Sequence, residues 1–173
     1  RGVCDPRGSH SFPTRRSSGL ERSGHIWHLT TLNGLQHNEI SALAADADGS
    51  VWIGSSFGGM CRWKRNVVEQ FDQPAEVHCL LQTDTNEIYA GVVDGLFRYD
   101  GTRWNRVAAC GKAQVRAITQ GAMGQIWMAT SVGIKPYDGF AVQTCTKADG
   151  MPGPRWDVAW DDREKAVRLA GRQ

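Results

Sequence analysis

Polar residues of four different chemistries occupy the same place in a pattern that recurs along this chain. They are Ser41, His78, Arg116 and Asp157, and the residues that follow each of them are small or apolar. A hydroxyl, an imidazole, a guanidinium and a carboxylate can all bind a polar ligand, through hydrogen bonds or through charge. A polar residue that varies on a constant frame is typical of a pocket rim. The alternative is that these side chains face solvent at the end of a strand.

Further candidates for a binding site lie in the loops that adjoin these positions. The loops are LQHN at 35–38, SSFG at 55–58, VVDG at 92–95, TSVG at 130–133 and MPGPR at 151–155. Their candidate ligand contacts are His37, Asn38, Phe57, Asp94 and Ser131. An exposed aromatic ring at Phe57 would favour a bound sugar or peptide. The alternative for Phe57 is a core contact that anchors its loop.

The sequence carries no pattern that is typical of a catalytic or metal centre. None of the histidines recurs at the repeat spacing with a carboxylate that would orient it as a base. Nucleophile, phosphate-loop and zinc-protease motifs are absent. The cysteines show no CxxC spacing, and a small buried thiol is the expected role for Cys61 and Cys79. We predict no catalytic residue, no metal site and no cofactor in this segment.

The frame that carries these residues is a repeat, which is marked most clearly by an aromatic residue. Trp52 in VWIG, Tyr89 in IYAG and Trp127 in IWMA follow one another at intervals of 37 and 38 residues. An apolar residue stands nine positions before each of them, and a glycine opens a short run after each that closes on another aromatic residue. A period of about 40 residues built from short strands is typical of a propeller blade.

Each copy reads as four strands. The first strand is expected at 40–44, 77–81 and 115–119, and a turn such as DADG or DTNE follows it. The second strand, VWI, IYA or IWM, is continuously apolar, which favours a sheet that is covered on both faces. DGTRW at 100–104 and DGF at 138–140 are typical of a hairpin turn into a fourth strand. The tryptophan or tyrosine of each copy is expected to pack between neighbouring blades.

We therefore predict an all-β fold: a partial β-propeller of about three to four four-stranded antiparallel blades, truncated at both ends. The blades are expected at about 40–71, 77–106 and 115–144, with a fourth that starts at 156 within the segment 40–171. Residues 21–39 resemble the end of a preceding blade and its connecting loop. Residues 1–20 are expected to lie outside the fold, because HSFPTRRSSGL at 10–20 resembles one reading frame of a sequencing adapter. The alternative is an Arg- and Ser-rich disordered tail.

The repeat closely resembles a known family. Its DxxGxVWIG core, the following GGMCRW and GLFRYDG, and the connecting TTLNGLQHNEI resemble the two-component regulator propeller repeat over roughly residues 24–171. Departures are Tyr89 in place of the blade tryptophan and the lack of an aspartate between Gln120 and Gly124. The resemblance implies an extracytoplasmic, periplasmic sensor propeller of a membrane-anchored bacterial signalling protein, with a kinase or cyclase module elsewhere in the intact protein.

Composition removes two classes of partner. The formal net charge is +2, but residues 1–22 carry a net +3 and the remaining chain about −1. A balanced surface without a basic stripe argues against nucleic-acid binding. No apolar run is long enough to span a membrane, so we expect no membrane contact by this segment itself.

The sequence thus predicts a ligand-sensing propeller segment, whose ligand is a small molecule or an oligosaccharide and whose output passes to a downstream signalling module. Two alternatives remain. One is a propeller enzyme of the streptogramin-lyase type, although its VWFTE-like strand is VWIGS here. The other is a scaffold for protein partners, which predicts a broad exposed patch in place of a pocket.

Overall fold

The computed structural model describes residues 27–72, 74 and 76–143, together with four further strands, of which it describes the backbone and the side chains of Val158 and Arg168. These strands are β1 (Val3–Cys4), β2 (His10–Ser11), β14 (Trp156–Asp161) and β15 (Ala166–Gly171). The described part is all-β, with three short 3₁₀ turns: η1 (Thr31–Asn33), η2 (Ala108–Cys110) and η3 (Ala122–Gly124). No helix among these residues is long and apolar enough to cross a membrane.

Two complete four-stranded antiparallel sheets form the first and second blades. Blade 1 contains β3 (Ile40–Ala45), β4 (Val51–Ser55), β5 (Met60–Lys64) and β6 (Val67–Phe71), paired in chain order. Blade 2 contains β7 (Val77–Gln82), β8 (Ile88–Val92), β9 (Gly95–Tyr99) and β10 (Trp104–Arg106) in the same order. The meander of four strands that the repeat predicts is therefore present in both.

The third blade has three strands within the described residues: β11 (Val115–Gln120), β12 (Ile126–Thr130) and β13 (Gly133–Tyr137). An antiparallel bridge joins Tyr137 to Val142 across the turn that the DGF motif predicts. The Asp138 carboxylate accepts the backbone N–H groups of Phe140 and Ala141 at 2.9 and 2.8 Å, which closes this turn. The same bonds hold the pKa of Asp138 below its usual range.

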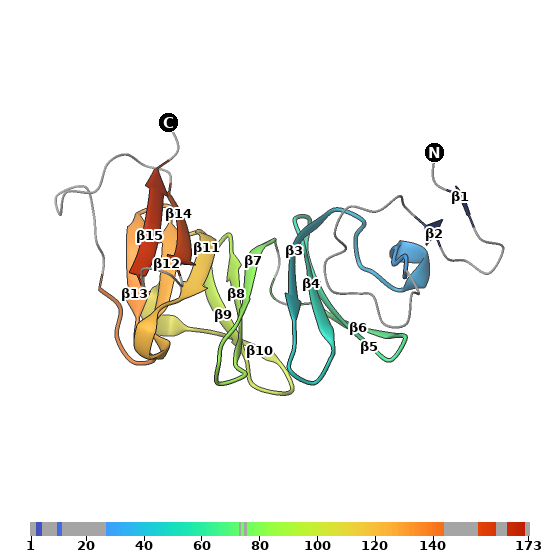
Figure 1. Cartoon of the computed structure of the whole chain (residues 1–173), viewed down its shortest axis with the longest axis horizontal. Helices are drawn as coiled ribbons and strands as arrows, with labels where there is room; N and C mark the ends of the chain where they lie inside the picture. The colour runs from blue at the N-terminus through green and yellow to red at the C-terminus, as the bar shows by residue number, and fades with distance from the viewer. Residues whose placement is uncertain are drawn as a thin grey trace.

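The first strands of successive blades lie next to one another, so that β3 contacts β7, β7 contacts β11 and β11 contacts β14 (Figure 1). The sheets stand face to face in a row and do not close into a ring. This arrangement confirms the predicted partial β-propeller. The predicted tail at 1–20 and the start of 21–39 lie outside the described residues, apart from the backbone of β1 and β2, and these assignments stay predictions.

The marker aromatic residues lie between neighbouring sheets, as the repeat predicts. Trp52 is fully buried, and its ring meets Tyr99 and Trp104 of blade 2 at centroid distances of 4.7 and 5.2 Å. Tyr89 is buried in a cluster that joins blade 2 to Val115 and Met128 of blade 3. Trp127 is only half-buried, against a small cluster that includes Val158 of β14. The face that blade 1 turns toward blade 2, and the face that blade 2 turns toward blade 3, are thus covered by the next blade.

Candidate functional site

A β-bulge recurs at the second residue of the first strand in all three blades. The pairing register shifts between Ile40 and Ala42, between Val77 and Cys79 and between Val115 and Ala117. The residues at the shifts are the predicted rim residues Ser41, His78 and Arg116. A bulge leaves one residue out of the ladder and changes the direction in which its side chain points. These bulges were not predicted from the residue pattern, and they occur at the polar positions in all three blades.

Two of the predicted loops are joined to these positions by backbone hydrogen bonds. The Ser56 N–H donates to the Glu39 carbonyl at 3.3 Å in blade 1, and the Ser131 N–H donates to the Gln114 carbonyl at 2.9 Å in blade 3. Each bond joins the turn between the second and third strands to the segment that enters the first strand. We call the edge formed by the three bulge residues and these loops the mouth. The turns between the first and second strands lie at the opposite edge, because consecutive antiparallel hairpins alternate.

Polar bonds link the bulge residues from one blade to the next. The Ser41 hydroxyl donates to the Val77 carbonyl of blade 2. The Gln114 Nε2 atom lies 2.9 Å from His78 Nε2, and Gln114 Oε1 accepts from Arg116 Nε at 3.2 Å and from Arg116 Nη2 at 3.0 Å. Since an amide nitrogen can only donate, His78 Nε2 accepts, and neutral His78 carries its proton on Nδ1. Gln114, which sequence reasoning missed, is the centre of this network.

Burial lowers the pKa of His78 below its usual value, because desolvation disfavours the imidazolium. The Arg116 charge acts in the same direction and the Glu76 carboxylate opposes it. Protonation would also place a second donor against the Gln114 amide and break that bond. The surroundings of His78 at the mouth therefore favour its neutral form.

Stability should depend on pH through His78. The unfolded chain binds more protons than the folded chain between the lowered pKa and the ordinary value of about 6.5, so the free energy of unfolding should rise with pH in that window. Urea unfolding of the wild type and of H78Q from pH 5 to pH 8 measures this effect. The stability difference between them should change below pH 6.5 and become constant above it. Parallel curves would show that His78 does not titrate on folding.

His37 and Phe57 come together at the blade 1 side of the mouth. Their ring centroids lie 5.1 Å apart with an interplanar angle of 38°. Phe57 is 65% exposed, so the alternative of a buried anchor is wrong, and its backbone N–H donates to Ser55 Oγ at 3.2 Å. Two exposed rings on a hydrogen-bonded turn can form a platform for an apolar ligand face.

The remaining candidates differ in how free their side chains are. Asn38 Oδ1 accepts from the Thr31 N–H at 2.8 Å and supports the entering loop. The Asp94 carboxylate is paired with Arg106, which also donates to the Asp94 carbonyl. Ser131 is exposed at the mouth. Asp157 lies on β14, where it pairs with Ala170 in regular register, and its side chain and the MPGPR loop lie outside the described residues.

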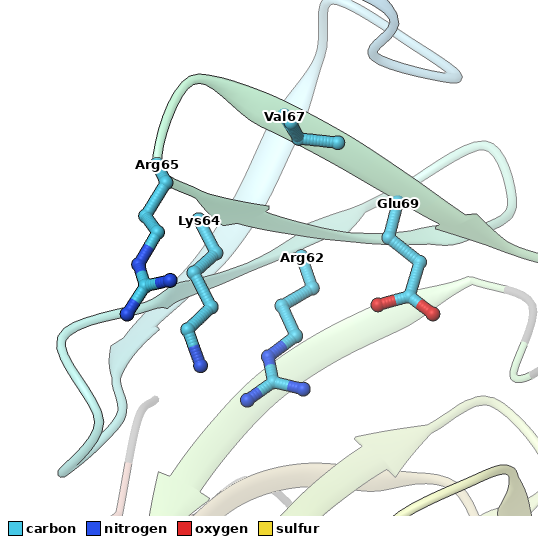
Figure 2. A pocket seen from close by; sticks show the side chains of 5 residues that line it. All are labelled: Arg62, Lys64, Arg65, Val67 and Glu69. Atoms are coloured by element: carbon cyan, nitrogen blue, oxygen red, sulfur yellow. The ribbon is translucent and has the colours of Figure 1, made fainter.

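A hollow of about 290 Å³ lies at the opposite edge, on the β5–β6 hairpin of blade 1. Figure 2 shows the side chains that line it, which are those of Arg62, Lys64, Arg65, Val67 and Glu69. Asp48 is bonded to both Arg62 and Lys64, and Arg62 lies over the Trp52 ring at 5.1 Å from its centroid. Since acidic residues neutralise two of its three cations, we interpret this cluster as ion pairs that stabilise blade 1.

Comparison with known proteins relates residues 34–57 to the two component regulator propeller family. These residues contain the entering loop, β3 and β4. Comparison with curated proteins gives no match.

Solved structures with the same fold include two extracellular domains from B. thetaiotaomicron, both described as belonging to hybrid two component systems. The first has a TM-score of 0.70 at 20% identity and covers 80% of this chain and 22% of its own. The second has a TM-score of 0.69 at 20% identity, with coverages of 79% and 21%. The present chain thus spans about a fifth of their length.

A catalytically inactive virginiamycin B lyase from Staphylococcus aureus, solved with quinupristin, also matches. Its TM-score is 0.62 at 14% identity, and the match covers 76% of this chain and 48% of the lyase. At these identities the likeness concerns the fold alone. The resemblance read from the sequence is confirmed: residues 34–57 match the two-component regulator propeller family, and the described blades have the β-propeller fold seen in extracellular domains of hybrid two component systems.

Proposed function

We propose that this chain is part of an extracytoplasmic, periplasmic propeller that senses a ligand for a bacterial signalling protein. The observation that carries the proposal is the bulge found at the same place in three consecutive blades, each presenting a different polar side chain at one edge. A structural bulge would not require Ser41, His78 and Arg116 to differ. Residues that differ on a repeated scaffold provide selective contacts to a ligand.

The ligand is a small molecule or an oligosaccharide. The exposed ring pair His37 and Phe57 offers an apolar face, and the bulge residues offer hydrogen bonds beside it. This combination suits a molecule that has both apolar and hydroxyl-bearing faces, as sugars do. Binding would be transmitted to a kinase or cyclase module of the intact protein, by analogy with the hybrid two component systems whose extracellular domains share this fold.

Binding can be tested on the purified chain with a panel of neutral and acidic mono- and disaccharides and amino acids, by thermal shift and then calorimetry. F57A should weaken binding of a panel ligand by about tenfold, as expected for an exposed aromatic contact worth roughly 1.4 kcal/mol. M123A is the matched control, because Met123 is fully exposed in the η3 turn at the opposite edge. Equal loss in both variants, or no binding by any panel member, would contradict a sensing mouth.

A further inference from the structure

Arg116 differs from most of the arginines whose side chains the structure describes. Four others each have a carboxylate oxygen within 4.0 Å, namely Arg62, Arg98, Arg103 and Arg106. Arg116 makes no such ion pair with any described side chain, although it is exposed at the mouth and not on an outer turn. Its charge is thus available to a group from solution.

Gln114 holds the guanidinium of Arg116 in a defined orientation. Its Oε1 atom accepts from Nε and Nη2, which uses two of the five N–H donors and leaves three. Gln114 is itself fixed at its other end by His78. An arginine whose rotamer is already restrained loses less entropy when it binds a carboxylate or sulfate group, so its affinity for that group is higher than that of a free surface arginine.

The charges around Arg116 favour an anion over a cation. Asp94 is already neutralised by Arg106, and Glu76 is exposed in the loop beside His78. Lys112 adds a second positive charge to the loop that contains Gln114. The side of the mouth between blades 2 and 3 is therefore weakly basic, whereas the chain outside residues 1–22 carries a net charge of about −1.

We propose that Arg116, positioned by Gln114 and His78, forms an anion subsite that binds a carboxylate or sulfate group of the ligand. This inference rests on the proposed function and adds to it the chemical class of the ligand. The sensed molecule is then an acidic one, such as a uronate-containing or sulfated saccharide. Gln114 acts as a positioning residue, because it contacts the arginine and not the anion.

The probes are D-glucuronate, D-glucose 6-sulfate and D-glucose, which share a sugar ring and differ in the acidic group. R116Q should weaken binding of at least one acidic probe by about tenfold or more, while D-glucose binding stays unchanged. Q114A should produce a smaller loss for the same probe, since the arginine keeps its charge and loses its orientation. The ratio of the affinities for D-glucuronate and D-glucose 6-sulfate distinguishes a carboxylate site from a sulfate site.

K112Q is the matched control, because it removes the same charge from the loop that leads into β11 without removing an oriented guanidinium. It should change the affinity by about twofold or less at 0.15 M salt, where exposed charges are screened. If K112Q and R116Q lower the affinity for an acidic probe equally, the effect is a general electrostatic attraction, and the proposed subsite is wrong. The proposal is also wrong if R116Q lowers the melting temperature but not the affinity, because Arg116 would then stabilise the contact between blades and not bind the anion.

The outcomes also separate this inference from the proposed function. A neutral panel ligand that F57A weakens and R116Q leaves unchanged would overturn the anion subsite and support the sensing mouth. An acidic probe that R116Q weakens and M123A does not would support both. If no probe or panel member binds, both are wrong.

Discussion

Replacing Trp52 by alanine should lower the free energy of unfolding by about 3–5 kcal/mol, the largest loss that we expect from a single substitution in this chain. Trp52 is fully buried and its ring contacts Phe71, Tyr99 and Trp104 at centroid distances of 4.7–5.4 Å. Its Nε1–H also donates to Asp46 at 3.0 Å. The alanine variant would leave a cavity between two blades and would lose this hydrogen bond to Asp46. Urea unfolding followed by circular dichroism measures the loss.

Phe57 provides the control for this substitution. It is also aromatic, but 65% of its surface is exposed, so F57A should change the stability by no more than about 0.5 kcal/mol. Comparing the two variants distinguishes residues that hold the fold from residues that bind ligand: W52A should lower the stability, and F57A should weaken binding. If W52A unfolds at the same urea concentration as the wild type, the aromatic residue is not the contact that joins the blades.

The repeat made the blades predictable. The spacing of Trp52, Tyr89 and Trp127 located the second strand of each sheet, and the alternation of turns and apolar runs located the others. Such patterns report burial, and burial between stacked sheets is what these residues share. The half-burial of Trp127 was not predictable from its type, since it depends on how fully the neighbouring blade covers it.

The site was predictable only in outline. The variation at Ser41, His78 and Arg116 indicated the positions of the candidate site. The bulges at these residues depend on the hydrogen-bond register between strands, which cannot be read from residue types. Gln114 looks like an ordinary loop residue, and its role appears only when β7 and β11 are adjacent. Asp94 was predicted as a ligand contact from its residue type and loop, and its ion pair with Arg106 could not be read from the sequence.

The close approach of neighbouring blades predicts a second large effect, at Gly54. A methyl group on Gly54 would lie 2.5 Å from Val77 Cγ1 and 2.8 Å from Val77 Cβ, which is far inside van der Waals contact. Val77 belongs to β7 of the next blade and is fully buried, so it cannot move aside freely. G54A should therefore lower the free energy of unfolding by about 1–3 kcal/mol through overpacking. A methyl group on Gly91 of blade 2 would likewise lie 2.4 Å from Cys79 Sγ and 2.7 Å from Val115 Cγ1 of blade 3.

The double variant G54A/V77A tests whether the clash between blades is the cause. V77A alone should cost about 1–3 kcal/mol for the lost methyl groups, but it also removes Val77 Cγ1, the atom nearest to the new methyl group on residue 54. The double variant should then be more stable than the sum of the two single losses predicts, by about 1 kcal/mol, a coupling typical of residues in contact. Strict additivity in urea unfolding would mean that the two side chains do not meet, and that the blades are spaced more widely than β3, β4 and β7 indicate.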